Sequence, residues 1–139
     1  MRRPSQARQN EVEQFLRHVE EWAKTRKNLA AVALVGSWAR GSARDDSDVD
    51  LVVLIETEND DWVAELAPGA ELVRRRDWGP VTEHRLRLPS GLEVEVGTAT
   101  PSWAAIDPVD AGTRRVVADG LRAVYDPQRL LAELACALR

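Results

Sequence analysis

Residues 36–54 read Gly-Ser-Trp-Ala-Arg-Gly-Ser-Ala-Arg-Asp-Asp-Ser-Asp-Val-Asp-Leu-Val-Val-Leu, and the pattern of the rest of the chain is best understood from this stretch. The apolar run Leu29–Val35 precedes it, and its last residues begin a second apolar run, Val49–Ile55. Short apolar runs bounded by turn-forming residues are typical of buried strands. The stretch therefore predicts two strands of one sheet, the second starting at Asp48, joined by a loop of small residues, arginines and acids.

The acids at the end of this loop are placed to bind a divalent cation. Asp48 and Asp50 are two residues apart at the start of a strand, so their side chains project from the same face. Paired carboxylates at such a position are ligands for a hard cation such as Mg²⁺. Asp46, Asp48 and Asp50 stand at alternate positions, as the first acids of an EF-hand calcium-binding loop do. Leu51 then stands where that loop needs glycine, and Thr57 where it needs glutamate, which excludes the calcium interpretation.

The beginning of the loop predicts a phosphate site. Gly36 and Ser37 form a small-residue turn, in which backbone N–H groups and a hydroxyl can hold phosphate oxygens. Arg40 and Arg44 add positive charge between this turn and the acids. Neither a Gly-x-Ser-x-Gly elbow nor the Gly-Lys-Ser/Thr of a Walker A loop is present, so Ser37 is expected to contact phosphate. Phosphate binding beside metal-binding carboxylates is what phosphoryl or nucleotidyl transfer requires.

The spacing Gly-Ser, ten residues, Asp-x-Asp resembles the motif of the polymerase-beta-like nucleotidyltransferase superfamily. The positions that match the pattern of its minimal nucleotidyltransferases are Gly36, Ser37, Ala39, Arg40, Gly41, Ser47, Asp48, Asp50 and Leu51. That group includes antitoxins that work beside a small helical toxin, and it is similar to aminoglycoside and lincosamide nucleotidyltransferases. The resemblance implies an α/β (α+β) fold of the polymerase-beta type. We expect a mixed five- to six-stranded sheet flanked by helices, in a single domain over residues 1–139.

The resemblance also implies roles for particular side chains. Asp48 and Asp50 would be catalytic metal ligands. The expected nucleotide-binding residues are Gly36, Ser37, Arg40, Arg44 and Ser47. Transfer with two Mg²⁺ ions, or with Mn²⁺, needs a third carboxylate from another strand. Glu95 is the preferred third ligand and candidate base because it lies deeper in its strand, and Glu93 on the same strand face is the alternative.

Hydrophobic periodicity predicts the elements around this motif. A helix is expected to begin at about Asn10, where Asn10 and Glu13 form a capping box, after flexible residues 1–9. Three further strands are expected at Glu71–Arg76, Val81–Leu88 and Leu92–Val96. The turn-forming residues 89–91 make the last two strands an antiparallel hairpin.

Aspartate-proline pairs predict the C-terminal helices. Asp107-Pro108 is expected to begin one helix, with aspartate as N-cap and proline at the first helical position, and Gly120 to end it. A short strand, Leu121–Tyr125, should follow, and Asp126-Pro127 should begin the last helix.

The composition is that of an ordinary globular domain, with 139 residues, 44% hydrophobic and 30% charged. No apolar run approaches the roughly 20 residues that span a bilayer, and no signal peptide opens the chain, so a cytoplasmic location without membrane contact is expected. The single cysteine excludes an internal disulfide, and the two histidines, His18 and His84, do not suggest zinc. The net charge of −4 argues against broad nucleic-acid binding.

These patterns predict a metal-dependent nucleotidyltransferase. It would move a nucleoside monophosphate, AMP by preference, from a nucleoside triphosphate such as ATP to an acceptor hydroxyl and release pyrophosphate. Three alternatives stay open. The chain is a small enzyme with an acceptor pocket between Trp78–Arg87 and Trp103–Arg115, an antitoxin-like protein that adenylylates or binds a helical toxin, or a non-catalytic nucleotide-binding module.

Arginines and tryptophans leave further alternatives open. The arginines that alternate along two expected strands are Arg74, Arg75, Arg76, Arg85 and Arg87. They form either a solvated strand face or a surface for an anionic acceptor or partner. Trp38 either packs beside the strand or stacks on a base. Tryptophans at the surface would favour a homodimer.

Overall fold

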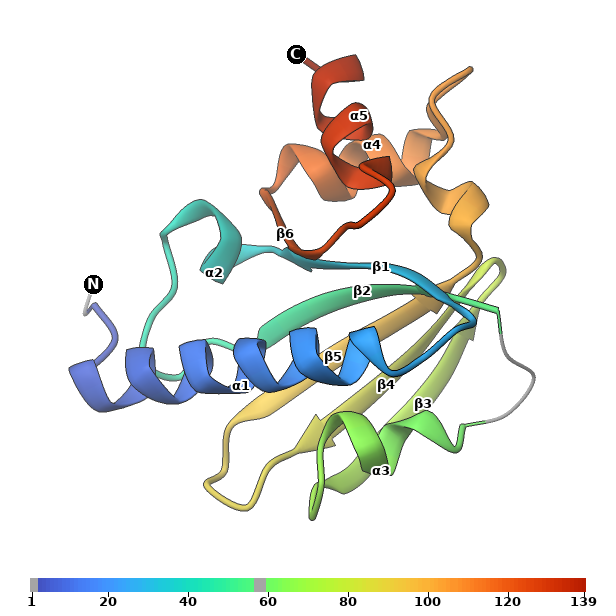
Figure 1. Ribbon diagram of the computed structural model, residues 1–139. Helices are drawn as coiled ribbons and strands as arrows, with labels where there is room; N and C mark the ends of the chain where they lie inside the picture. Colours follow the sequence, from blue (N-terminus) through green and yellow to red (C-terminus); the bar gives the residue numbers. More distant parts are fainter. Residues whose placement is uncertain (1–2, 57–59) are drawn as a thin grey trace.

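The structure, a computed structural model, describes residues 3–56 and 60–139. Its strands are β1 (Leu29–Val35), β2 (Val49–Ile55), β3 (Glu71–Trp78), β4 (Val81–Arg87), β5 (Glu93–Ala99) and β6 (Leu121–Tyr125). Its helices are α1 (Gln6–Lys24), α2 (Ser37–Arg40), α3 (Trp62–Leu66), α4 (Ala111–Ala118) and α5 (Leu130–Ala137), with a 3₁₀ turn η1 (Pro101–Ala104). The strands form a six-stranded sheet in the order β3-β4-β5-β2-β1-β6, flanked by helices (Figure 1). The expected α/β fold with a mixed sheet is confirmed.

The sheet is mixed because β5 returns beside β2 in the same direction. The pair β2–β5 is parallel, and the other neighbouring strands pair antiparallel. The two apolar runs form β1 and β2, which are almost entirely buried, as strands covered on both faces should be. In contrast, β3 forms an edge of the sheet, and all of its residues are exposed.

Helices cover the two faces of the sheet unequally. On one face α1 and α3 contribute Val19 and Trp62 to a core that also contains Leu51 of β2. On the other face α4, α5 and η1 lie over the end of the sheet formed by β1 and β6, where Leu131 and Leu134 are buried (Figure 1). Side chains of β4 and β3 on this second face stay partly or fully exposed.

The N-terminal helix starts earlier than the sequence predicts. α1 begins at Gln6, and the hydroxyl of Ser5 accepts a hydrogen bond from the backbone N–H of Arg8 at 3.1 Å. The expected capping box of Asn10 and Glu13 is wrong, because Ser5 offers an equally good N-cap further upstream. Residues 6–9 of the segment predicted to be flexible are therefore helical.

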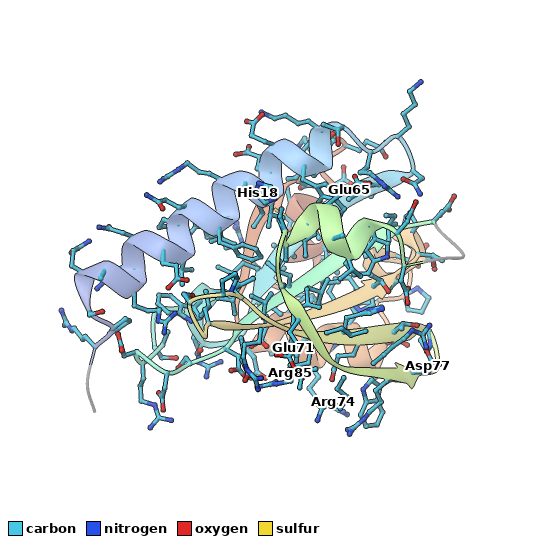
Figure 2. The ribbon with its side chains drawn as sticks, turned by 90° about the horizontal axis from the view of Figure 1, so that it is seen from below. His18, Glu65, Glu71, Arg74, Asp77 and Arg85 are labelled. Carbon is cyan, nitrogen blue, oxygen red and sulfur yellow. The ribbon has the colours of Figure 1, made fainter. Side chains whose placement is uncertain are left out.

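α1 lies along the sheet and contacts α3. The Nε2 atom of His18 on α1 lies 3.1 Å from the carbonyl oxygen of Glu65 on α3, where the two helices are neighbours (Figure 2). Within residues 3–56 and 60–139, no helix is long and apolar enough to cross a membrane.

The helix predicted at Asp107-Pro108 begins three residues later. α4 starts at Ala111, and the carboxylate of Asp110 accepts hydrogen bonds from the backbone N–H groups of Gly112 and Thr113 at 2.9 and 3.2 Å. The prediction placed the N-cap at the wrong aspartate. Two aspartates of the same local type stand close together here, and only the one that meets two free N–H groups starts the helix.

The last helix also starts late, although the predicted aspartate does serve it. α5 begins at Leu130, after Arg129 in a left-handed conformation with φ of 60°. The carboxylate of Asp126 nevertheless accepts hydrogen bonds from the N–H groups of Leu131 and Ala132 at 3.1 and 3.0 Å. Asp126 therefore satisfies the first turn of the helix from outside it.

The predicted hairpin between β4 and β5 is confirmed as antiparallel. Leu92, Val94 and Val96 are buried, whereas Glu93 and Glu95 are only partly buried and lie on the opposite face. This alternation turns both glutamates toward the face of the sheet that α1 and α3 do not cover.

Candidate active site

Gly36 ends β1 in a conformation that suits only glycine. Its φ and ψ are 75° and −153°, and its carbonyl oxygen accepts hydrogen bonds from the N–H groups of Ala39 and Arg40 at 3.0 and 3.1 Å. A Cβ atom at this position would lie 2.6 Å from Oδ2 of Asp50. Glycine therefore lets the start of α2 approach the carboxylate of Asp50.

The two halves of the loop between β1 and β2 are tied together. The indole N–H of Trp38 donates to the carbonyl oxygen of Ser47 at 3.2 Å, and its ring packs against the core. The hydroxyl of Ser47 accepts a hydrogen bond from the backbone N–H of Arg44 at 2.8 Å. Of the two interpretations of Trp38, packing beside the strand matches these contacts. Trp38 and Ser47 hold the loop that leads into the acids.

The three acids predicted to act together come from neighbouring strands. Asp50 of β2 and Glu95 of β5 are register partners in the parallel pair. Asp48 immediately precedes β2, two residues from Asp50, and its side chain retains 35% exposure against 25% for Glu95. Strand alternation and the β2–β5 pairing together gather these carboxylates on one face.

Asp50 has a strongly perturbed electrostatic environment. Burial, together with the negative charges of Glu95 and Asp48, raises the pKa of Asp50 from 3.8 to about 7, partly opposed by the positive charge of Arg85. In the described part of the chain, no cationic side chain lies within ion-pair distance of Asp50. A positive charge brought to this position would therefore be attracted strongly.

Arg85 of β4 projects into the acids, and the sequence analysis did not assign it to the site. Its Nη2 atom lies 2.6 Å from Oδ2 of Asp48, its Nε atom 2.6 Å from Oε1 of Glu93, and its Nη1 atom 3.1 Å from Oε1 of Glu95. Hydrogen bonds to Asp48 and Glu93 raise the pKa of Arg85, so it stays cationic. The sequence did contain a signal for this position. Arg85 and Glu95 are equally far from Ser90 in the predicted hairpin turn, so a hairpin centred on Ser90 makes Arg85 and Glu95 register partners.

Glu93 and Glu95 differ in what surrounds them. Glu93 accepts from Arg85 and also from Arg87, whose Nη2 atom lies 3.1 Å away, and these hydrogen bonds lower the pKa of Glu93. Glu95 lies level with Asp50 and contacts Arg74 at 3.2 Å. Both glutamates also contact Arg85, and the register places Glu95, not Glu93, beside Asp50. The choice of Glu95 as the third acid stays a prediction.

Three arginines of β3 and β4, Arg74, Arg85 and Arg87, contribute to the same face. Figure 2 shows Arg74 and Arg85 with Glu71 on the side of the sheet away from α1. Arg87 joins Glu71 at 3.4 Å as well as Glu93. Arg74, Arg85 and Arg87 are all paired with carboxylates of this face. Arg75 instead pairs with Asp60 and Asp77, and the guanidinium of Arg76 lies 5.2 Å from the ring centroid of Trp78.

The donor set of the three acids fits a divalent cation, although the side chains do not form a finished cage. Asp48, Asp50 and Glu95 offer hard carboxylate oxygens on one face, and their mutual repulsion would be relieved by a dication. Among the residues that the structure describes, no group of three acids, histidines or cysteines stands close enough to hold a metal ion. Arg85 contacts one oxygen of Asp48 and one of Glu95, so its guanidinium occupies part of the space and part of the lone pairs that a cation shared by both carboxylates would use.

The two predicted phosphate-binding arginines, Arg40 and Arg44, make different contacts. Arg40 donates from Nη1 to the carbonyl oxygen of Asp119 at 2.9 Å, which ties α2 to the end of α4. Arg44 is exposed, with its Nε atom 3.8 Å from Asp46. Ser37 begins α2 directly after Gly36. The structure thus brings the glycine turn and the acids together, but directs Arg40 toward α4.

Two pockets flank the acids. A pocket of about 310 Å³ is lined by Arg8, Asp46, Ser47, Asp48, Arg85, Gly91, Leu92 and Glu93. A second pocket of about 170 Å³ is lined by Val35, Asp50, Leu51, Val52, Val81, Glu83, Glu95, Gly97, Trp103 and Val116. The second has mostly apolar walls and includes the carboxylates of Asp50, Glu83 and Glu95. It includes Val81, Glu83 and Trp103 from the two segments between which the sequence analysis expected an acceptor.

Comparison with known proteins adds a family and a set of similar folds. A family model described as a nucleotidyltransferase domain matches residues 13–98. No curated protein matched the sequence. A cytoplasmic RNA terminal U-transferase is 20% identical over 69% of this chain and 30% of its own, with a TM-score of 0.52. Cid1 in complex with its short product ApU is 22% identical over 69% of this chain and 32% of its own, also with a TM-score of 0.52.

A toxin-antitoxin structure with AMP-PNP is 17% identical over 93% of this chain and 82% of its own, with a TM-score of 0.46. The likeness to the U-transferase and to Cid1 concerns the fold alone, and the chain spans only 30% and 32% of their lengths. The family match is broader, because residues 13–98 are more than half of the 139 residues and include the glycine turn, the paired aspartates and Glu95. The chain belongs to the nucleotidyltransferase domain family.

Proposed function

We propose that the chain transfers a nucleoside monophosphate from a nucleoside triphosphate to an acceptor hydroxyl, with release of pyrophosphate. The observation that carries this proposal is the convergence of Asp48, Asp50 and Glu95 beside the Gly36 turn, within a nucleotidyltransferase domain. Phosphoryl-type transfer needs little covalent chemistry from the protein and depends on positioning and charge. A row of carboxylates fixed by strand pairing beside a glycine turn supplies that positioning.

Asp48, Asp50 and Glu95 would hold Mg²⁺, or Mn²⁺ in its place. A bound divalent cation neutralises charge on the triphosphate and lowers the pKa of a hydroxyl next to it. The support for this assignment is electrostatic, because burial and the charges of Glu95 and Asp48 raise the pKa of Asp50 to about 7. Such a cluster is stabilised by a cation and disfavoured without one.

The loop residues would bind and orient the triphosphate. Ser37 and the first backbone N–H groups of α2 directly follow Gly36, which lies against the carboxylate of Asp50. Ser47 and Arg44 lie on the second half of the loop. We expect Arg44, which is exposed, to contact phosphate more readily than Arg40, whose guanidinium binds the carbonyl of Asp119. ATP is the first donor to test.

Glu95 would accept the proton of the acceptor hydroxyl. It lines the pocket of about 170 Å³ together with Asp50 and Trp103. A lining of mostly apolar side chains together with three carboxylates suits a small acceptor with an apolar body and a hydroxyl that can approach the acids. The size of the pocket supports a small-molecule acceptor or a single side chain of a protein acceptor.

A binding role that involves a protein partner is the second candidate function. The large apolar side chains exposed on β3 are Leu72, Val73 and Trp78, at 50%, 41% and 55%. An exposed apolar edge strand is a common interaction surface, because it offers unpaired backbone groups beside apolar side chains. This observation favours a protein partner, such as a helical toxin, whether the chain adenylylates it or only binds it.

The test is calorimetric binding of a non-hydrolysable ATP analogue, with and without Mg²⁺, to the wild type and to Asp50→Asn. We expect Mg²⁺-dependent binding by the wild type that Asp50→Asn abolishes while its circular dichroism stays native. Pyrophosphate release in the presence of candidate acceptors should fall by more than tenfold in the variant. Turnover by Asp50→Asn within tenfold of the wild type would refute the assignment, and binding without turnover in any condition would favour the second candidate.

A further inference from the structure

The side chain of Arg85 makes the densest set of charged contacts on the acidic face. All three of its guanidinium nitrogens lie within 3.1 Å of a carboxylate oxygen, and the three carboxylates belong to Asp48, Glu93 and Glu95. Charge-assisted hydrogen bonds of this length are the strong ones, and each occupies a lone pair of the acceptor oxygen. Two of these three acids are the residues to which the proposed function assigns a metal.

We propose that Arg85 is an internal counter-cation that competes with a divalent metal ion for the carboxylates of Asp48 and Glu95, so that metal binding requires its guanidinium to withdraw. This inference rests on the proposed function and adds a control on the same site. Arg85 then acts as a positioning residue that sets how tightly the metal binds.

The charge balance of the face supports this assignment. Its carboxylates are Asp48, Asp50, Glu71, Glu83, Glu93 and Glu95, and its guanidinium groups are Arg74, Arg85 and Arg87. Removal of Arg85 leaves the acids with a larger excess of negative charge. An isolated cluster of this kind repels itself, so a guanidinium stabilises it while no metal ion is bound.

The position of Arg85 lets it leave without unfolding the strand. Its backbone is fixed in β4 as the register partner of Glu95, but its side chain is only partly buried, with 21% exposure. The contact from Nε to Glu93 at 2.6 Å lies on the side away from Asp50. Rotation of the outer guanidinium about this contact would release Asp48 and Glu95 while one strong ion pair remains.

Arg87 provides a matched control on the same strand. It carries the same side chain two residues later and pairs with Glu93 and Glu71, at 3.1 and 3.4 Å, and it makes no ion pair with Asp48 or Glu95. A general effect of removing positive charge from this face would change metal binding in both variants. Competition for the metal ligands would change it only when Arg85 is replaced.

The experiment measures Mn²⁺ binding to the full chain from the electron paramagnetic resonance signal of free Mn²⁺, with and without a non-hydrolysable ATP analogue. We expect Arg85→Gln to bind Mn²⁺ at least tenfold more tightly than the wild type, and Arg87→Gln to stay within twofold. Asp50→Asn introduced into Arg85→Gln should remove the gain. Arg85→Lys keeps the positive charge but has one nitrogen for three carboxylates, so it should give a smaller gain in Mn²⁺ affinity. This variant replaces Arg85→Gln in the experiment if Arg85→Gln does not fold.

Each outcome has a distinct meaning. If the wild type binds Mn²⁺ and Arg85→Gln binds it equally or less tightly, the proposed competition between Arg85 and the metal is wrong. The proposed function would still stand. A gain that survives Asp50→Asn, or one that Arg87→Gln shares, would also overturn it, because the metal or the effect would then lie elsewhere. Absence of Mn²⁺ binding in both the wild type and Arg85→Gln, with and without nucleotide, would overturn both this inference and the metal-dependent function.

Discussion

Asp50 and Glu95 are register partners on the parallel strands β2 and β5, so two carboxylates from distant parts of the chain lie side by side on one face of the sheet. The same row continues to Arg85 on β4 and Arg74 on β3. Backbone hydrogen bonds between the strands hold these side chains level, and the site is therefore built on the rigid part of the fold. The predictions below test this relationship and its surroundings.

Replacement of Asp50 should change how stability depends on pH. Its pKa is about 7 in the folded chain and near 3.8 when unfolded, so between these values the folded state keeps a proton that the unfolded state has lost. The wild type should therefore lose stability relative to Asp50→Asn as the pH rises from about 4 to about 7. The difference in free energy of unfolding, Asp50→Asn minus wild type, should therefore increase by roughly 1–3 kcal/mol between pH 4 and pH 8. Urea unfolding without added metal at both pH values measures this, and a difference of opposite sign would contradict the environment described for Asp50.

Gly36→Ala should damage both stability and the site. The new Cβ would lie 2.6 Å from Oδ2 of Asp50, at a backbone conformation open almost only to glycine. Gly41 is the control, because it also has a positive φ, of 76°, but a Cβ there would meet no atom within 4 Å. We expect a loss of about 1 kcal/mol for Gly41→Ala and of about 3 kcal/mol or more for Gly36→Ala, measured by urea unfolding. Equal losses would show that Asp50 does not press against Gly36.

The two glutamates of β5 should differ in function. Glu95→Gln removes the carboxylate level with Asp50, and Glu93→Gln removes one that pairs only with arginines among the described residues. Both substitutions keep the size of the side chain. We expect Glu95→Gln to lower pyrophosphate release by about 100-fold or more, the range of a lost general base, and Glu93→Gln to lower it by less than about tenfold. The reverse order would make Glu93 the third acid.

Asp126→Ala should destabilise the chain through the start of α5. Its carboxylate accepts hydrogen bonds from the N–H groups of Leu131 and Ala132, and alanine leaves both without this partner. A loss of about 1 kcal/mol is expected, typical of a lost helix cap. Asp126→Asn keeps an acceptor oxygen, so its loss in free energy of unfolding should be only a few tenths of the loss in Asp126→Ala. Urea unfolding should therefore show Asp126→Asn to be the more stable variant. Equal effects would assign the loss to charge and not to capping.

Much of the site could be predicted because its pattern is local. The apolar runs Leu29–Val35 and Val49–Ile55 fold as the predicted central strands, and alternation along β2 and β5 turns Asp50 and Glu95 toward the predicted face. Helix starts were predicted less well. Ser5 replaces Asn10 as the N-cap of α1, and Asp110 replaces Asp107 as the N-cap of α4, because several residues of suitable type stand near each start and tertiary packing selects among them.

The sequence by itself determined the glycine turn, the paired aspartates and the faces on which Asp48, Asp50 and Glu95 lie, because side-chain alternation follows from the covalent geometry of an extended chain. Only the tertiary structure decided that β5 lies parallel beside β2 and that Arg85 reaches three of the acids. Strand order depends on which distant segments bury their apolar faces together. The partners of a charged side chain then depend on that order, so the contacts of Arg85 emerge only when the whole sheet has formed.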